Sequence, residues 1–475
     1  MKRSATSWTL AMLLLVAIAA PAAEVPNPCL FIDDAFVAES YRIKRVLQQP
    51  EKLPEPIFRG NGKWDLNPYL FGTVIFDEED GIYKMWYQSY NYGQPMVTRT
   101  PFLYATSNDG LTWKRPDLGL FEWQGSKENN IVLQNAGFHD AYSPSVVKDP
   151  FAKDPRRRYK MAFWDFCGHD AYGGDSGMMI AFSPDGIHWT RLQERPVLVA
   201  QKQENAISDV INVMQDLDTR KFLVFAKGWA DPFPSHRQIV RAESDDFINW
   251  STPEPVIRHA NDRQDPESYG MGAFKTSGMY FGVLRIYKSK TTKRIDTQLA
   301  ASYDGKSWFR VADQATFIPN GPEGSWDAGM IFAVAPVIRG DTMQFFYGGW
   351  DAAHDDRDRN AAIGLACLPV NRFVAIMAEC AASELRTKPF VLEKDMRITV
   401  NADGRDGEIR VALLAEDGAE IPAFGHNDAP PIRSNGFRHP VLWHGKTLPE
   451  AFIGKPVRLH FSVKGNAKLF AFERR

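Results

Sequence analysis

One seven-residue pattern decides the fold, and it occurs four times: Ser107-Asn-Asp-Gly-Leu-Thr-Trp113, Ser183-Pro-Asp-Gly-Ile-His-Trp189, Ser244-Asp-Asp-Phe-Ile-Asn-Trp250 and Ser302-Tyr-Asp-Gly-Lys-Ser-Trp308. The Ser, Asp and Trp keep the same spacing in every copy. An Asp at this place can accept hydrogen bonds from backbone N–H groups, glycine takes a positive φ, and Trp packs between neighbouring sheets. We therefore interpret these aspartates as turn builders and not as catalysts.

The copies begin at residues 107, 183, 244 and 302, so consecutive copies are 76, 61 and 58 residues apart. An interval of this length fits a unit of about four strands. Each unit also holds a hairpin made of an apolar strand, an Asp/Gly-rich turn and an aromatic strand. The five hairpins span residues 73–90, 145–166, 210–229, 269–287 and 332–350. Five such units around an axis predict an all-β, five-bladed β-propeller whose inner strands aim their first residues into a central funnel.

The strands become shorter after residue 375, and Asp/Gly turns such as Asn401-Ala-Asp-Gly404 separate them. About eight short strands with alternating apolar residues indicate a small β-sandwich. We therefore expect a signal peptide at residues 1–22, a five-bladed propeller at residues 23–375 and a C-terminal sandwich at residues 376–475. The sandwich is expected to stabilise the propeller, with carbohydrate binding as its alternative role.

Composition and charge exclude several classes of protein. The chain has 475 residues, of which 44% are hydrophobic and 12% aromatic, and its formal net charge is -2. The longest basic run is Arg156, Arg157 and Arg158, so nucleic acid is not an expected partner. Thirteen Trp with 35 Gly and 31 Pro indicate a turn-rich β protein, which excludes disorder or a coiled coil as the main state.

The N-terminus has the layout of a secretory signal peptide. Lys2 and Arg3 precede an apolar run from Trp8 to Ala19, and Ala20-Pro21-Ala22 supplies small residues for cleavage. The alternative, an N-terminal membrane anchor, needs a longer apolar run. No other stretch of about 20 apolar residues occurs. We expect a periplasmic or secreted protein that has no membrane partner after cleavage, and its oligomeric state is left open.

The cysteines predict no zinc site. Cys29, Cys167, Cys367 and Cys380 contain no Cys-x-x-Cys pair. Disulfides are permitted in an exported protein, and Cys367 and Cys380 are the nearest pair in sequence. Spacing alone does not fix their connectivity.

Two further segments carry a resemblance to a known family. Gly81-Ile-Tyr-Lys-Met-Trp-Tyr-Gln88 looks like the Gly-x-Tyr-His-x-Phe-Tyr-Gln strand of glycoside hydrolase family 32, and Ile363-Gly-Leu-Ala with Arg372-Phe-Val is similar to the strand that closes those propellers. With the turns and the sandwich, nearly the whole mature chain resembles the five-bladed propeller glycosidases of families 32 and 43. Sialidase turns have one more residue between Ser and Trp, which disfavours a six-bladed sialidase. The resemblance implies that acids on inner strands cleave a glycosidic bond.

Two positions differ from the family pattern. Asn67, within Trp64-Asp-Leu-Asn67-Pro68, stands where the family has its nucleophilic aspartate. Ser143-Pro144 stands where an Asp-Pro would begin the second unit. An amide cannot be the nucleophile, so either the acids of this chain lie elsewhere or the propeller binds glycans without cleaving them.

Glycoside hydrolysis requires two carboxyl groups, one protonated and one ionised. Glu267 begins the fourth unit, where family 43 places its general acid, and burial beside Tyr269 and Met271 is expected to raise its pKa. Asp209 begins the third unit and is, with Asp65 of the first, the candidate base or nucleophile. A solvated rim position for Glu267 and a turn cap for Asp209 are the structural alternatives.

Other side chains at the same end of the propeller are candidates for substrate binding. They are Trp64, Asn67, His139, Asp140, Tyr269, Trp326, Asp327 and His354. Trp326 could stack on a sugar face. A histidine helps to hold a central ion in family 43, so the resemblance implies that a structural calcium in the funnel is conceivable. No other cofactor is expected, and a structural role is the alternative for a lone histidine such as His354.

The leading functional hypothesis is a secreted glycoside hydrolase that acts on a poly- or oligosaccharide through inner-strand carboxylates. The alternative is a non-catalytic glycan-binding propeller, which Asn67 and Ser143 motivate. A third hypothesis, a glycoside phosphorylase, needs a cluster of cations for phosphate, and only Arg285 and His354 suggest one from the sequence.

Overall fold

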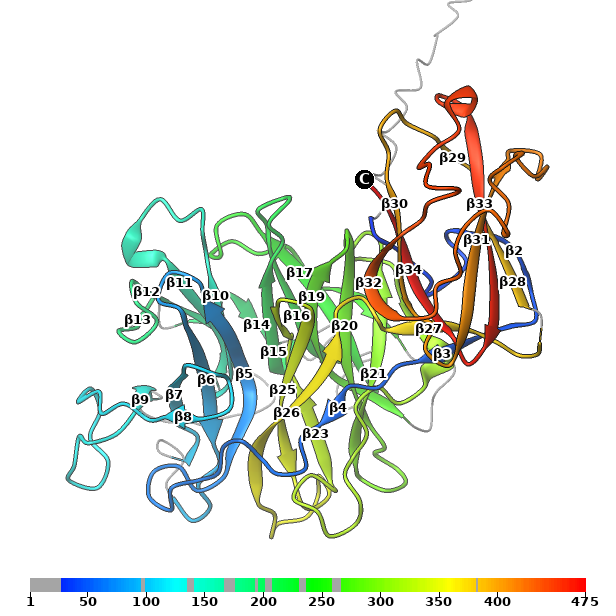
Figure 1. Ribbon diagram of the computed structural model, residues 1–475. Coiled ribbons are helices and arrows are strands. Elements are labelled where there is room, and N and C mark those ends of the chain that lie inside the picture. Colours follow the sequence, from blue (N-terminus) through cyan, green and yellow to red (C-terminus); the bar gives the residue numbers. More distant parts are fainter. Residues whose placement is uncertain are drawn as a thin grey trace, which may run out of the picture.

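The computed structural model describes residues 27–94, 99–134, 141–165, 176–192, 195–200, 207–229, 236–258, 266–381 and 383–475. Regular structure in these ranges is almost entirely β-strand, which confirms the predicted all-β class (Figure 1). Among the described residues, three short 3-10 turns accompany the strands: η1 (Pro155–Arg157), η2 (Ala312–Gln314) and η3 (Glu450–Phe452). No helix in the described ranges is long and apolar enough to span a membrane. The predicted signal peptide lies outside these ranges.

Antiparallel pairing groups the strands of the propeller into successive short meanders. The first unit comprises β5 (Pro68–Asp77), β6 (Ile82–Ser89), β7 (Phe102–Ser107), β8 (Trp113–Lys114) and β9 (Ile131–Leu133). The second comprises β10 (Ala141–Lys148), β11 (Tyr159–Asp165), β12 (Gly177–Ser183), β13 (Thr190–Arg191) and β14 (Leu198–Val199). The third comprises β15 (Ile207–Gln215), β16 (Phe222–Trp229), β17 (Arg237–Ser244) and β18 (Glu254–Ile257).

The last two units share one sheet, because Ile295 pairs in parallel with Met330. The fourth unit comprises β19 (Glu267–Thr276), β20 (Met279–Tyr287), β21 (Ile295–Ser302) and β22 (Trp308–Arg310). The fifth comprises β23 (Met330–Ala333), β24 (Val337–Arg339), β25 (Thr342–Trp350) and β26 (Ala361–Pro369), with β4 (Glu51–Lys52) paired on β26. β5 contacts β10, β10 contacts β15, β15 contacts β19, and β5 also contacts β23 and β25. The first strands of the units therefore surround a common axis.

The sandwich packs two sheets against each other. One sheet holds β27 (Val374–Ala378), β30 (Ile398–Asp403), β32 (Asn435–Pro440), β34 (Lys468–Arg474), β1 (Cys29–Leu30) and β3 (Ile43–Leu47). The other holds β28 (Ser383–Thr387), β29 (Phe390–Val391), β31 (Gly407–Ala415), β33 (Pro456–Gly465) and β2 (Val37–Tyr41).

The N-terminal boundary of the propeller differs from the prediction, which placed residues 23–47 in it. In the structure β1, β2 and β3 belong to the sandwich, and Figure 1 shows this blue segment among the orange and red strands. Their partners are remote in the chain, since Val46 pairs with Ala375 and Val37 with Thr387. Only β4 continues into the propeller, where it closes the fifth unit.

Alternate residues of one strand face the two neighbouring units, which explains why the strands are buried on both faces. On β6, Met85 and Tyr87 pack with Phe346 of the fifth unit. Trp86, between them, packs with Met161 of the second unit. This period of two gives each unit two buried faces.

The repeated turns have the structure that the sequence predicts. In the first copy, Asp109 Oδ1 accepts from the backbone N–H groups of Leu111 and Thr112 at 2.8 and 2.7 Å, and Trp113 Nε1 donates to the Gly110 carbonyl. Ser183, Ser244 and Ser302 and the aspartates two residues after them repeat this arrangement. Phe247 takes the glycine position of the third copy with a φ of 68°. The aspartates are turn builders, as predicted.

The two cysteines nearest in sequence do not form a disulfide. Cys367 and Cys380 are both thiols. Cys367 lies on β26 of the propeller, whereas Cys380 follows β27 of the sandwich. The two cysteines are therefore close in sequence but belong to different domains.

At the ends of two inner strands, a buried aspartate binds lysine and tyrosine side chains of the next unit, and we call each such cluster a clasp. The sequence analysis did not predict these clusters. Asp216, just after β15, accepts hydrogen bonds from Tyr280 Oη at 2.6 Å and from Lys275 Nζ at 2.9 Å, both in the next unit. Asp77 at the end of β5 uses Lys148 and Tyr159 in the same way. Each clasp therefore joins two units by a buried carboxylate.

The Asp216 clasp predicts a pH-dependent contribution to stability. Burial alone would raise the pKa of Asp216, but Tyr280, Lys275 and Thr219 lower it to about 2. Because the folded-state pKa lies below the unfolded value of 3.8, the contribution is present above about pH 4 and is lost as the pH falls toward 2. We expect Asp216→Asn to lower the urea midpoint at pH 7, with the difference from wild type shrinking toward pH 3.

The control for that experiment is Asp218→Asn. Asp218 also pairs with Lys275, but its side chain is 75% exposed, so this change should move the midpoint little at any pH. A difference between Asp216→Asn and wild type that is as large at pH 3 as at pH 7 would contradict this account.

Candidate active site

Four inner strands lose their regular register close to their first residues. The shifts fall between Tyr69 and Thr73 on β5, Tyr142 and Ser145 on β10, Ile207 and Ile211 on β15, and Ser268 and Gly270 on β19. Bulges of this kind bend a strand and re-aim its side chains, and they are common beside active sites. Ser143 and the candidates Asn67, Asp209 and Glu267 lie at this end of the strands.

Asp209 is an ionised carboxylate that solvent reaches. Its Oδ1 lies 2.5 Å from Lys227 Nζ on β16 and accepts from Ser208 Oγ at 2.9 Å. The Asp209 side chain is 30% exposed, whereas that of Lys227 is 5% exposed. Burial alone would raise the pKa of Asp209, but the Lys227 charge and the hydrogen bonds hold it below its ordinary value.

Glu267 is ionised as well, which corrects the sequence-based expectation. Its Oε2 lies 2.6 Å from Arg237 Nη1, and its Oε1 accepts from the Ser289 hydroxyl. Burial raises its pKa as expected, but the Ser289 hydrogen bond and the Arg237 charge outweigh burial and hold the pKa below its ordinary value. The predicted rise is therefore wrong, because the two donors come from segments that the local sequence does not show.

A hydrogen-bonded chain runs through Tyr269, His354 and Asp355. Tyr269 Oη lies 2.9 Å from His354 Nε2, and His354 Nδ1 lies 2.8 Å from Asp355 Oδ1. The hydrogen bond from His354 helps to hold the pKa of Asp355 low, and burial lowers the pKa of His354. An ionised Asp355 accepts the Nδ1 proton, so His354 Nε2 is left to accept the Tyr269 hydroxyl proton. Tyr269, His354 and Asp355 therefore have the arrangement of a hydroxyl, a base and an acid that orients the base.

The Tyr269 ring joins this chain to the two carboxylates. Lys227 Nζ lies 4.6 Å from the ring centroid, and the Arg237 guanidinium lies 5.7 Å from it. Burial opposes the charge on Arg237, but Tyr269, Glu267 and Asp209 raise the pKa of its guanidinium. Asp209, Glu267, Tyr269 and His354 are therefore brought together in the structure.

Arg359 connects the aromatic ring of Tyr92 to the cluster. It donates to the His354 carbonyl and, at 3.2 Å, to Tyr92 Oη. The Tyr92 ring is 37% exposed and packs on Tyr90 at 4.7 Å between centroids. An exposed aromatic ring beside polar side chains is suited to stacking on a sugar face.

Asn67 and Ser143 hold the strand starts in place. Asn67 Oδ1 accepts from the Ala361 N–H at 3.2 Å and so ties the first unit to β26 of the fifth. Ser143 has a φ of 62° and donates from Oγ to the Asp209 carbonyl at 3.0 Å. Both side chains are buried, at 7% and 0% exposure.

Asp65 and Trp64 lie in a different cluster. Asp65 is completely buried and pairs with Arg115, whose Nη2 lies 2.7 Å from Oδ2. Burial raises the pKa of Asp65 in spite of this partner. Trp64 Nε1 donates to Asn130 at 2.7 Å. None of these partners contacts Asp209 or Glu267 in the described structure, so Asp65 is not brought to them.

Trp326 and Asp327 secure the closing strand. Asp327 Oδ2 lies 2.8 Å from Lys52 Nζ on β4, and Asp327 is 3% exposed. Trp326 stacks on Tyr347 at 5.5 Å and donates to the Pro54 carbonyl at 3.2 Å. Their contacts are with β4 and its neighbourhood, and they are not partners of the Asp209 cluster.

The remaining candidates, His139 and Asp140, lie outside the described residues. In the part of the chain that is described, no group of three His, Cys, Asp or Glu side chains is placed to hold a metal ion.

Lys227, Arg237 and Asp355 contact the candidate residues, and the sequence analysis did not name them. Lys227 interrupts the apolar run Phe222-Leu-Val-Phe-Ala-Lys227 of a strand, and a charge in a buried strand signals a partner. Asp355 lies in a stretch rich in charged residues, Asp355-Asp-Arg-Asp-Arg359, which is typical of a solvated loop, and it is half exposed while it also contacts His354 and Tyr287. Nothing local distinguishes Arg237 from other surface arginines.

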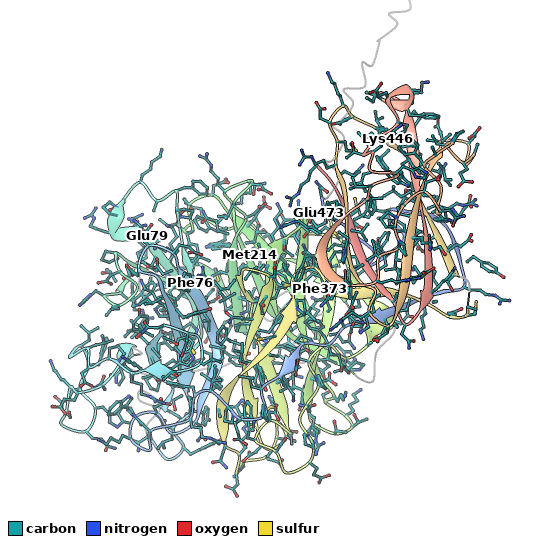
Figure 2. All side chains as sticks on the ribbon, viewed as in Figure 1. Phe76, Glu79, Met214, Phe373, Lys446 and Glu473 are labelled. Atoms are coloured by element: carbon teal, nitrogen blue, oxygen red, sulfur yellow. The ribbon has the colours of Figure 1, made fainter. Side chains whose placement is uncertain are left out.

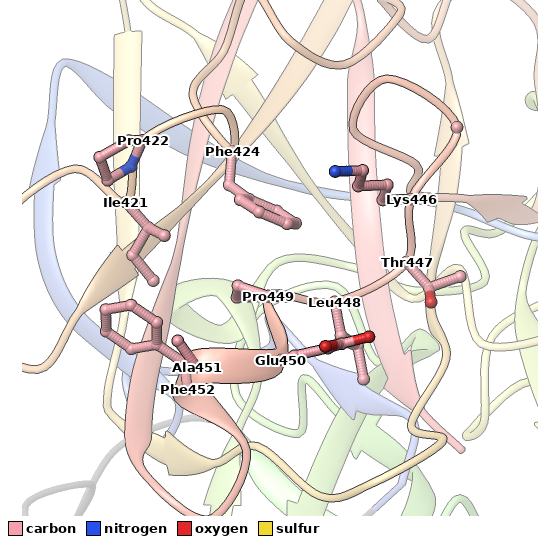
Figure 3. Close-up of a pocket in the computed structure, with 11 residues that line it drawn as sticks. Ile421, Pro422, Phe424, Lys446, Thr447, Leu448, Pro449, Glu450, Ala451 and Phe452 are labelled. Carbon is pink, nitrogen blue, oxygen red and sulfur yellow. The ribbon is translucent and has the colours of Figure 1, made fainter.

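Two cavities lie away from the cluster around Asp209 and Glu267. One, of 780 Å³, is at the opposite mouth of the ring, and Figure 2 shows its lining residues Phe76, Glu79 and Met214 along one rim of the propeller. Its lining acids are Asp77, Glu78, Glu79 and Asp218, and each of them is paired with a lysine or an arginine. The other, of 720 Å³, lies in the sandwich between Phe424, Leu448 and Phe452, with Glu450 as its one lining acid (Figure 3).

No family model matches the sequence, and no curated protein matches it. The chain is similar to several solved structures. A fructofuranosidase of Schwanniomyces occidentalis is 12% identical, with 91% of this chain and 99% of that one covered and a TM-score of 0.43. A glycosyl hydrolase of Bacteroides ovatus is 15% identical, with coverage of 74% and 98% and a TM-score of 0.45. An N-acetylgalactosamine deacetylase of F. plautii is 15% identical, with coverage of 73% and 96% and a TM-score of 0.44. These likenesses concern the fold, and the functional argument rests on the residues of the site.

Proposed function

We propose that the chain is a glycoside hydrolase that acts on a poly- or oligosaccharide at the inner-strand starts, with Asp209 as the reacting carboxylate. The observation that carries this proposal is a solvent-accessible carboxylate held ionised by the buried Lys227. A glycosidase needs such a group to attack the anomeric carbon or to take a proton from the attacking water. The resemblance of the sequence to propeller glycosidases agrees with it.

Glu267 acts as a positioning residue in this proposal. Both of its oxygens already accept hydrogen bonds, one from Ser289 and one from Arg237, and the side chain is 8% exposed. Its low pKa leaves it without the proton that a general acid donates. Glu267 therefore holds Arg237 against the Tyr269 ring.

In this proposal Tyr269 donates its hydroxyl proton to the leaving oxygen, and the resulting phenolate regains a proton from solvent. The chain of Tyr269, His354 and Asp355 lies beside the carboxylates through the Tyr269 ring, and its two hydrogen bonds are 2.9 and 2.8 Å long. A hydroxyl and an imidazole in contact can pass a proton in either direction. The exposed ring of Tyr92 supplies a stacking surface for a sugar.

The experiment that tests the proposal is reducing-end release from a panel of plant, algal and bacterial polysaccharides and aryl glycosides. Release above a heat-treated control supports a hydrolase. Glycan binding on an array without release from any substrate would instead favour the second candidate, a glycan-binding propeller, for which Asn67 at the family's nucleophile position is the specific observation.

Glu267→Gln separates a positioning role from general acid catalysis. The amide keeps the size of the side chain but loses its charge, so we expect kcat to fall about tenfold while the alkaline limb of the pH profile stays in place. A loss of about a hundredfold or more together with the disappearance of that limb would show that Glu267 is the acid. The rate of reducing-end release between pH 4 and pH 9 measures both quantities.

Export to the periplasm or the medium is part of the same proposal. It is supported by Lys2, Arg3 and the apolar run before Ala20-Pro21-Ala22. N-terminal sequencing of the protein recovered from the periplasmic fraction should begin near Ala23. Recovery of the intact N-terminus in the membrane fraction would contradict export with cleavage.

A further inference from the structure

The centre of the ring holds an arginine that has no acidic partner among the described residues. Arg285 on β20 is 0% exposed, and its Nε and Nη2 donate to the Ala333 carbonyl at 3.2 and 2.9 Å. Its Nη1 has no hydrogen-bond partner in the part of the chain that the structure describes. No described carboxylate forms an ion pair with this guanidinium, and burial lowers its pKa to about 9. A buried cation without an anion destabilises the folded protein, so a role in ligand binding would explain why Arg285 is present.

The unpartnered Nη1 is aimed toward the strand starts of the candidate site. A Cβ added to Gly270 would lie 3.0 Å from Nη1 and 2.6 Å from Val210. Gly270 and Val210 directly follow Tyr269 and Asp209 in the chain. The missing side chain of Gly270 thus leaves Nη1 beside the two strands that present the proposed reacting groups.

The described part of the site carries more positive than negative charge. Lys227 and Arg237 are balanced by Asp209 and Glu267, and Asp355 lies 3.5 Å from Lys293. Arg285 is bonded only to a carbonyl, and the described partners of Arg359 are carbonyls and the Tyr92 hydroxyl. Asp209 acts electrostatically on Tyr269, and so do three cations, Arg237, Arg359 and Arg285.

We propose that this site binds an oxyanion group of its ligand through Arg285, with Arg359 as a second cation. The proposal rests on the proposed function for the location of the site and adds the chemistry of the ligand. Guanidinium N–H groups bind carboxylate and phosphate oxygens with directed, charge-assisted hydrogen bonds. The same oxyanion chemistry is offered by a uronic acid residue of an acidic glycan and by free inorganic phosphate.

Calorimetric titration of the full mature protein tests the proposal. The probes are galacturonic acid, glucuronic acid, their neutral counterparts galactose and glucose, and sodium phosphate, all at one ionic strength. Wild type is expected to bind at least one oxyanion probe at least tenfold more tightly than the neutral sugars. Arg285→Met should abolish this preference, and Arg285→Lys, which keeps the charge, should retain part of it.

The matched control is Arg372→Met. Arg372 is also buried, at 5% exposure, but it bonds Asn401 and backbone carbonyls at the junction with the sandwich. This variant should lose stability and keep the oxyanion preference. If Arg285→Met does not fold, Arg359→Met takes its place and should weaken oxyanion binding at least threefold.

The probes separate the two sources of the oxyanion. Tight uronic acid binding that phosphate does not displace assigns the site to an acidic glycan, and tight phosphate binding alone assigns it to free phosphate. Equal binding of acidic and neutral probes by wild type, or a preference that survives in folded Arg285→Met, would overturn the proposal. Asp209→Asn should keep the preference while it loses hydrolysis, so failure of the proposed function is seen separately.

Discussion

Asp209→Asn is expected to lower kcat/KM for glycan hydrolysis by about a thousandfold, within the range typical of a lost base or nucleophile. The amide can still accept a hydrogen bond from Lys227, but it can neither attack carbon nor take a proton from water. The change leaves the buried Lys227 without this negative partner, so the thermal midpoint should fall, and the rates of variant and wild type are compared well below both midpoints. Initial rates of reducing-end release measure the effect.

Asp218→Asn is the control for Asp209→Asn. Asp218 follows the other end of the same strand, β15, and its side chain is 75% exposed. Its replacement should leave kcat/KM unchanged. Full activity in Asp209→Asn, or an equal loss in both variants, would remove Asp209 from the reaction.

The second large effect concerns stability. Asp77 is fully buried, and its carboxylate accepts from Lys148 Nζ at 2.5 Å, from Lys84 Nζ at 2.8 Å and from Tyr159 Oη at 2.5 Å. These donors join the first and second units. Asp77→Ala leaves two lysines without their shared carboxylate, so we expect a loss of about 3 to 5 kcal/mol in the free energy of unfolding, measured by urea titration at pH 7.

Glu79→Gln is the matched control in the same turn. Glu79 also contacts Lys148, at 3.2 Å, but it is 62% exposed, so its replacement should cost about 0.5 kcal/mol or less. An Asp77→Ala protein within about 1 kcal/mol of wild type would show that the clasp is not a main link between the units.

The turns made most of the propeller predictable, because their hydrogen bonds are local. Ser107 and Asp109 form hydrogen bonds to groups within three residues, so the seven residues of the motif specify the structure of the turn. The positions of β1 to β3 were not predictable in the same way. Their partners lie more than 300 residues away, and no local pattern states which domain a short N-terminal strand will join.

The site was predictable to the extent that it follows strand starts. Asp209, Glu267, Tyr269 and His354 were all named from their positions in the repeat, and the structure places them in one cluster. Their protonation states were not predictable, because Lys227 and Arg237 come from other strands. Trp326 and Asp327 look like site residues in sequence, but the partner that engages them, Lys52, arrives from outside the repeat.

The most direct test of the central claim is chemical rescue of Asp209→Ala on the substrate that wild type cleaves. Removing the side chain leaves room beside Lys227 for a small external anion. The account predicts that sodium formate or azide raises the rate of the inactive variant at least tenfold, with no effect on wild type. A rate that formate and azide leave unchanged, in a variant that still binds the substrate, would contradict Asp209 as the reacting carboxylate.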